Sequence, residues 1–428
     1  MADNSPYEKI TLGNGLRVIL VPQGTGLAAT ILVLVEAGSK YETKDINGLS
    51  HFLEHMCFKG TAKRPKAMDI ASEFDGMGAS YNAFTSQEYT GYYAKIESRQ
   101  FSRALDLIAD MYLNPLFDVQ EIEKEKDVIV EEIRMYEDLP PRKVHDLFTN
   151  LLYGDQPAGW DITGTPEIVR SLTREAIVGY RAKHYVPGAT VVVVAGGYDR
   201  AAVLQDIARL FGGVPRDHKH GKVNVRESQT EPRVLLRAKE SDQTHLVLGC
   251  RAFPVSDRRR YVLEVLSDIL GGGMSSRLFQ KIREELGAAY YVRSGTELFT
   301  DHGYLAISAG VHHEKFIQVV GEIARELARI AREPVGDEEL ARAKEHLSGN
   351  LILSLETSDA LAMFYGGDEI LERRLETPQE LLSKIQAVRA EDVRACAEFL
   401  FRNDRLNLAA IGPLHESDEL RGALRFTQ

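Results

Sequence analysis

The chain has 428 residues, of which 44% are apolar and 27% are charged, and its net charge is −11. This length exceeds one ordinary core, and the composition is typical of a globular, water-soluble protein with more than one domain. The negative charge argues against nucleic acid as a partner. The longest apolar run, residues 27–35, is too short for a membrane helix, so no membrane partner is expected. Three scattered cysteines and a polar N-terminus favour the cytoplasm.

The predicted elements of the first half alternate between strands and helices. Asn14-Gly15 separates two apolar segments and therefore predicts a β-hairpin. Asp118 and Glu121 have the spacing of a capping box, which fixes the start of a long helix. The further strands are expected at 27–35, 80–84, 89–95 and within 186–197, and the helices at 45–56, 66–75, 101–112, 118–138 and 173–184.

The second half repeats this order of elements. A polar stretch at 216–230 predicts a linker between an N-terminal domain, 1–215, and a C-terminal domain, 231–428. After it come the strand-like RVLLRAK and THLVLGCRAF, the helix-like YVLEVLSDIL, and GAAY, which matches GASY of the first half. We infer a divergent duplication. The expected class is α+β, with two homologous α/β-sandwich halves, each a mixed, mostly antiparallel sheet with helices packed on it.

The segment DINGLSHFLEHMCFKG carries the residues that indicate chemistry. His51 and His55 are four residues apart, so on a helix both imidazoles project from one face, and Glu54 lies on the flank of that face. Two neutral imidazoles bind Zn²⁺ well, and a nearby glutamate can accept a proton from water. His-x-x-Glu-His is the inverted form of the zincin motif. The alternative is a solvated polar helix face.

A catalytic zinc needs a third protein ligand, and the acidic helix EIEKEKDVIVEEIRMYED offers several carboxylates. Projection at about 100° per residue places Glu125 and Glu132 together on the shoulder of its apolar stripe, whereas Glu131 points toward solvent. A buried carboxylate is costly unless a partner compensates it, and a metal would do so. Glu132 is then the candidate ligand, and Glu125 a group that orients a histidine. Pairing of both carboxylates with lysine or arginine is the equally open alternative.

Three segments resemble one known family in the right order: HFLEHMCFKGT, YNAFTSQEYTGYYAK and EKEKDVIVEEI. The chain resembles the inverzincins, which comprise pitrilysin, insulin-degrading enzyme and the mitochondrial processing peptidase, over nearly its whole length. The resemblance implies one zinc ion per subunit and places the third ligand on Glu132. It implies a metalloendopeptidase in which Glu54 is the catalytic base.

The resemblance to half-length bacterial members also implies a clam-shell dimer that encloses its substrate. A peptide would bind as an added β-strand along an edge that contains Asn82 and Ala83. Arg283 and Tyr290, seven residues apart, match a pair that reaches the zinc site from the opposing half and stabilises the oxyanion. Because this chain carries both the ligands and the pair, a homodimer is expected, with a heterodimer of homologous subunits as the alternative.

In the second half, Ala343 and Asn350 stand where the two glutamates of the acidic helix would fall, so this half is expected to bind no zinc. The predicted function is therefore zinc-dependent endopeptidase or oligopeptidase activity on peptides or leader segments enclosed in the dimer. The alternative is a non-catalytic core or assembly subunit, because the family also contains such subunits in respiratory complexes.

Overall fold

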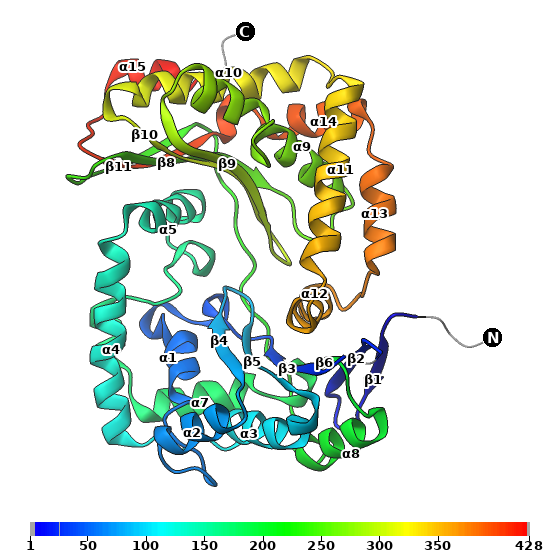
Figure 1. Cartoon of the computed structure of the whole chain (residues 1–428). Coiled ribbons are helices and arrows are strands. Elements are labelled where there is room, and N and C mark those ends of the chain that lie inside the picture. The colour runs from blue at the N-terminus through cyan, green and yellow to red at the C-terminus, as the bar shows by residue number, and fades with distance from the viewer. Residues whose placement is uncertain (1–4, 25, 426–428) are drawn as a thin grey trace. The chain divides into compact units, whose positions relative to one another are not determined.

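The computed structural model describes residues 5–24 and 26–425, and it contains two β-sheets with helices packed on them (Figure 1). The first sheet has the order β1-β2-β6-β3-β5-β4. Its strands are β1 (Glu8–Thr11), β2 (Arg17–Pro22), β3 (Ala28–Val35), β4 (Ser80–Thr85), β5 (Thr90–Glu97) and β6 (Thr190–Gly196). The predicted hairpin is present as the antiparallel pair β1–β2.

The second sheet has the order β7-β11-β8-β10-β9. Its strands are β7 (Arg233–Ala238), β8 (Thr244–Ala252), β9 (Ala289–Leu298), β10 (Gly303–Val311) and β11 (Asn407–Gly412). Each sheet has one parallel pair, β2–β6 in the first and β7–β11 in the second, and the other pairs are antiparallel. The second sheet thus repeats the order β2-β6-β3-β5-β4 strand for strand, as a duplication requires.

The helices cover both faces of each sheet. Those of the first half are α1 (Leu49–Met56), α2 (Ala67–Gly76), α3 (Phe101–Leu113), α4 (Val119–Glu137), α5 (Pro140–Tyr153), α6 (Pro166–Ser171), α7 (Arg174–His184) and α8 (Arg200–Phe211). Those of the second half are α9 (Arg260–Gly271), α10 (Phe316–Arg332), α11 (Asp337–Ser354), α12 (Ser358–Leu371), α13 (Pro378–Gln386), α14 (Ala390–Leu400) and α15 (Asp418–Ala423). Among the described residues, none of these helices has the length and apolar character that a membrane crossing requires.

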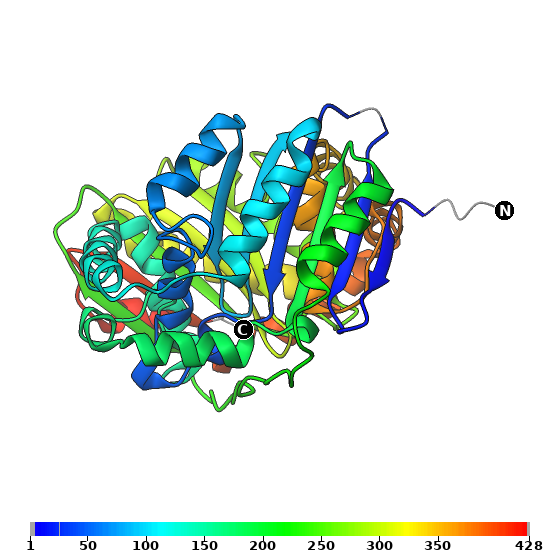
Figure 2. The ribbon, with the colours of Figure 1, turned by 90° about the horizontal axis from the view of Figure 1, so that it is seen from below.

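The strand β3 shows why its sequence is a continuous apolar run. Ile31 and Val33 face a core formed with α1 and α3, whereas Leu32 and Leu34 face a second core formed with α12. Figure 2 shows α3 in cyan and α8 in green lying along the same face of the first sheet. A strand covered on both faces is apolar throughout and does not alternate.

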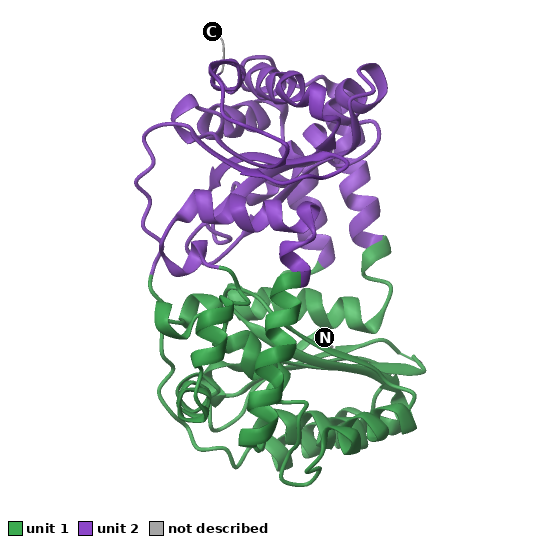
Figure 3. Cartoon of the chain, turned by 90° about the vertical axis from the view of Figure 1, so that its left-hand side faces the viewer, with its two compact units in different colours: residues 1–134, 161–223, 353–377 green, residues 135–160, 224–352, 378–428 purple. Residues whose placement is uncertain are grey.

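Each sheet receives one covering helix from the other half of the sequence. The first compact unit comprises residues 1–134, 161–223 and 353–377, and the second comprises 135–160, 224–352 and 378–428 (Figure 3). Helix α12 therefore packs on the first sheet and α5 on the second. The chain passes between the units at five points, of which one, 223–224, lies inside the predicted linker, whereas the predicted domains are the contiguous spans 1–215 and 231–428.

The contact of α12 with the first sheet is close and charged. A Cβ at Gly366 would lie 2.8 Å from Leu34 Cδ1, so the glycine lets the helix lie close to the sheet without displacing that side chain. Farther along α12, the fully buried Glu369 pairs with Arg17 at 3.0 Å and with Lys9 at 2.6 Å. Because a buried charge is costly without a partner, these pairs hold Glu369, and with it α12, against this face of the sheet.

Candidate metal centre

Helix α1 carries two of the predicted ligands, and it is shorter than the predicted helix at 45–56. A 3₁₀ turn occupies Lys44–Ile46, and α1 begins at Leu49 because Gly48 has a φ of 96°. A Cβ at Gly48 would lie 2.5 Å from the carbonyl oxygen of Thr163, so glycine is needed here both for the left-handed turn and for the close packing of these two backbone segments. The turn sets the direction in which α1 leaves the loop.

A buried carboxylate caps α1 from outside the helix. Glu42 accepts hydrogen bonds from the backbone N–H of Gly48 at 2.8 Å, from that of Ser50 at 2.6 Å and from Asn47 Nδ2 at 3.0 Å. Burial raises the pKa of Glu42 to about 7, although these hydrogen bonds act in the opposite direction. The unpaired N–H groups of a helix start favour such an acceptor, which holds the first turn in place.

The apolar face of α1 is fully packed, which leaves the other face for polar groups. The side chains of its apolar face lie in the core of the first unit: Leu49, Phe52, Leu53 and Met56. His51, Glu54 and His55 project from the opposite flank, as the helical spacing predicts.

The two histidines converge on Glu132 of α4. His51 Nε2 lies 3.7 Å from Glu132 Oε2, and His55 Nε2 lies 3.6 Å from the same oxygen. One ligand atom of each residue lies within 4.8 Å of the other two. Ligands about 2.1 Å from a tetrahedral zinc are separated by about 3.4 Å, so this set of two imidazoles and one carboxylate fits a zinc ion with little adjustment.

The second glutamate of the acidic helix contacts a ligand. Glu125 is 3% exposed, and its Oε1 lies 2.8 Å from His55 Nδ1. Its Oε2 lies 2.6 Å from Lys59 Nζ. Burial alone would raise the pKa of Glu125, but the hydrogen bonds to His55 and Lys59 outweigh it and lower the pKa. A carboxylate that receives the Nδ1–H of a histidine leaves Nε2 unprotonated and able to bind a metal.

Glu54 lies beside the ligands and is held by a threonine. It is 9% exposed, and its Oε2 accepts a hydrogen bond from Thr85 Oγ1 at 2.6 Å. Burial raises the pKa of Glu54, while the hydrogen bond from Thr85 opposes this shift. A carboxylate with a raised pKa is a stronger base than an exposed one, which suits proton transfer.

The remaining predicted residues lie on two edge strands and one helix. Asn82 and Ala83 are on β4, the edge strand of the first sheet, and Asn82 Oδ1 accepts a hydrogen bond from the Ala83 N–H at 2.9 Å. In the second unit, Arg283 lies on a π-helix, Phe279–Glu285, and its guanidinium is 5.9 Å from the ring of Tyr290. Tyr290 is 73% exposed on the edge strand β9.

Sequence reasoning missed three residues that support this centre: Glu42, which caps α1, Lys59, which contacts Glu125, and Thr85, which contacts Glu54. Glu42 and Thr85 come from a loop before α1 and from the end of β4, and no spacing within either segment indicates the contact. Lys59 follows His55 by four residues, the separation that aligns side chains on a helix. This spacing could have indicated that Lys59 lies near His55, although Lys59 itself is beyond the end of α1 at Met56.

Comparison with known proteins identifies the class. The insulinase family of peptidases, family M16, matches residues 17–166, and the peptidase M16 inactive domain matches residues 171–347. A Bacillus subtilis protein named uncharacterized zinc protease YmxG is 39% identical over 406 residues, which cover 95% of this chain and 98% of that protein. A Streptomyces coelicolor relative, also named a zinc protease, is 36% identical over 96% of this chain and 91% of its own length. The chain belongs to the insulinase family of peptidases, as its motifs predicted.

Solved structures share the fold. A protease from Helicobacter pylori superposes with a TM-score of 0.89 at 23% identity, covering 95% of this chain and 99% of that one. A chain of Complex III2 from Candida albicans superposes with a TM-score of 0.84 at 18% identity, covering 97% and 99%. At these identities the likeness concerns the fold alone, and it confirms the prediction of two homologous α+β halves.

Proposed function

We propose that this protein is a zinc-dependent endopeptidase or oligopeptidase. The observation that supports the proposal most strongly is the convergence of His51, His55 and Glu132 on one point, with Glu54 beside them. Two relatives carry the name uncharacterized zinc protease, which also supports the proposal. The cytoplasm, inferred from the sequence, is the proposed location.

The proposed reaction is hydrolysis of a peptide bond by water. His51, His55 and Glu132 would hold zinc, which supplies a Lewis acid that polarises a carbonyl and acidifies water. Glu54 would accept the proton of the attacking water at Oε1, since Thr85 already donates to Oε2. The same carboxyl group then returns the proton to the nitrogen of the leaving amine, which completes the exchange of a C–N bond for a C–O bond.

Substrate binding is proposed at the β4 edge. An extended peptide could pair with the backbone of Asn82 and Ala83, which gives affinity with little demand on side chains. The Ala83 N–H bonds to the Asn82 side chain, so the peptide would take over this hydrogen bond.

A cleavage assay with and without metal tests the proposed function. The purified full chain should hydrolyse internally quenched peptides, lose activity when 1,10-phenanthroline removes zinc, and regain it when zinc is restored. Activity that is insensitive to the chelator would contradict the zinc mechanism. A chain that binds no zinc and cleaves no peptide would favour the non-catalytic core subunit that the same family contains.

We also propose that Arg283 and Tyr290 complete the zinc site of a partner subunit in a homodimer. Tyr290 is exposed, and the Arg283 guanidinium lies over the rings of Phe279 and Tyr290, so both side chains lie at the surface of the second unit. A guanidinium and a phenol are donors suited to an oxyanion.

Co-expression of two inactive variants tests this arrangement. Glu54→Gln and Tyr290→Phe chains should each be impaired alone. If sites are shared, a mixed dimer has one intact site, and random pairing should restore about a quarter of wild-type activity. No recovery despite mixed dimers, shown by two different affinity tags, would mean that Tyr290 does not act across subunits.

A further inference from the structure

Lys59 makes a contact that the proposed catalytic scheme does not use. Its Nζ lies 2.6 Å from Glu125 Oε2, while Glu125 Oε1 lies 2.8 Å from His55 Nδ1. The three residues therefore form a chain of contacts that ends on a proposed metal ligand. Lys59 belongs to neither metal-bearing helix but to the loop that follows α1.

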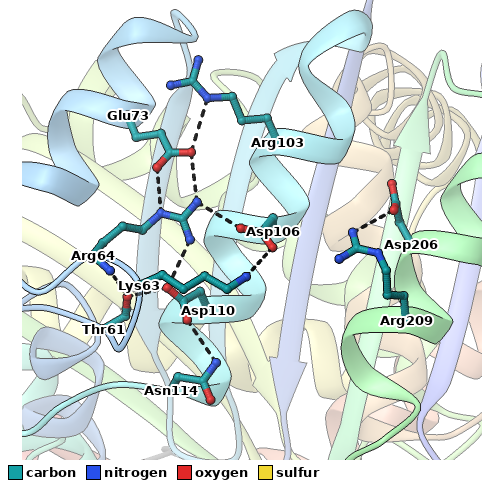
Figure 4. Close-up of polar contacts among 10 residues, drawn as sticks. All are labelled: Thr61, Lys63, Arg64, Glu73, Arg103, Asp106, Asp110, Asn114, Asp206 and Arg209. Carbon is teal, nitrogen blue, oxygen red and sulfur yellow. Dashed lines mark hydrogen bonds and ion pairs between the residues drawn. The ribbon is translucent and has the colours of Figure 1, made fainter.

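This loop, residues 57–66, is held by a second and separate set of ion pairs (Figure 4). Arg64 Nε lies 2.7 Å from Glu73 of α2, and its Nη2 and Nη1 lie 3.0 Å from Asp106 and 3.1 Å from Asp110 of α3. Figure 4 shows the Arg64 guanidinium enclosed by these three carboxylates. A planar cation bound on several sides fixes the loop backbone, and so fixes where the stem of Lys59 starts.

The positive charge of Lys59 compensates the negative charge of the buried Glu125. A carboxylate that is only 3% exposed is costly unless cations or hydrogen-bond donors satisfy both oxygens. His55 satisfies one oxygen and Lys59 the other. Without Lys59, Glu125 would be free to rotate away or to admit water, and the orientation of the His55 ring would lose its support.

We propose that Lys59 is a positioning residue of the metal centre, which acts through Glu125 to fix the orientation of His55. This inference rests on the proposed function, since it assumes that zinc binds to His51, His55 and Glu132. This role is distinct from general support of the loop. Lys63, in the same loop, pairs with Asp106 at 2.6 Å and so supports the loop without contacting a metal ligand or Glu125.

The test is the zinc affinity of the full-length protein, measured by competition with a chromophoric chelator. Lys59→Met should bind zinc about 10-fold more weakly than wild type, at the lower end of the range for loss of an outer partner of a metal ligand. Lys59→Arg, which keeps the charge, should restore most of the affinity. Lys63→Met is the matched control and should bind zinc like wild type.

A double variant separates action through Glu125 from damage to the loop. In a Glu125→Gln background, Lys59→Met should weaken zinc binding no further, because the carboxylate through which it acts is gone. Unchanged affinity in Lys59→Met, an equal loss in Lys63→Met, or additive losses in the double variant would each overturn the inference. If Lys59→Met does not fold, Lys59→Gln is read by the same criteria. Failure of the wild type to bind zinc would overturn the proposed function itself.

Discussion

Replacing Glu54 with glutamine is expected to leave zinc bound and to lower kcat by about 10²- to 10⁴-fold, the contribution of a general base. The amide has nearly the same shape as the carboxylate, and its oxygen can still accept the Thr85 hydrogen bond. What it cannot do is accept a proton from water. Zinc content by atomic absorption and turnover of a quenched peptide measure the two effects separately.

The contrast with a ligand variant makes this result specific. His51→Ala removes an imidazole from the centre and should lose the metal together with the activity. Full activity in Glu54→Gln would remove this residue from the mechanism. Loss of zinc in Glu54→Gln would show that the residue supports the metal centre and would leave the identity of the base open.

The second large effect is expected from Glu132→Gln, which should abolish zinc binding at stoichiometric metal. The carboxylate supplies the oxygen that both histidine rings approach, and a neutral amide is a much weaker ligand. The loss of affinity should exceed the about 100-fold that removal of an outer partner of a ligand can cause. Competition with a chelator of known affinity measures it.

The neighbouring residue provides a matched control for the acidic helix. Glu131 is exposed and pairs with Arg134 at 2.5 Å, so Glu131→Gln changes the charge of α4 by the same amount without touching the centre. It should bind zinc like wild type, since an exposed ion pair contributes about 1 kcal/mol or less. A loss of zinc in both variants would mean that the charge of α4, and not a ligand, determines the affinity.

The metal-bearing part of this molecule could be predicted because its geometry is local. His51, Glu54 and His55 lie within one helical turn, and the period of the helix alone places them on one face. Glu125 and Glu132 could be singled out by the same period within α4. Their contact with α1 is a tertiary contact. Helical projection left it open whether the glutamates bind a metal or pair with lysine or arginine. The structure shows that Glu125 contacts a basic side chain, Lys59, as well as His55.

The exchange of α5 and α12 could not be predicted from the sequence. Neither segment is among the helices predicted from the sequence; 140–153 begins with two prolines, and 358–371 contains two adjacent glycines. Gly366 weakens the helical signal because glycine has no side chain, and the same lack of a side chain allows α12 to lie close to Leu34. Which sheet a helix covers depends on the shape of a distant apolar face, and no local period encodes that.

Zinc-edge anomalous diffraction from crystals of the protein would show directly whether these three residues bind the metal. We expect one anomalous peak per chain, within bonding distance of His51 Nε2, His55 Nε2 and a Glu132 carboxylate oxygen. Absence of a peak there in crystals grown with equimolar zinc, or a peak bound by other residues, would contradict it.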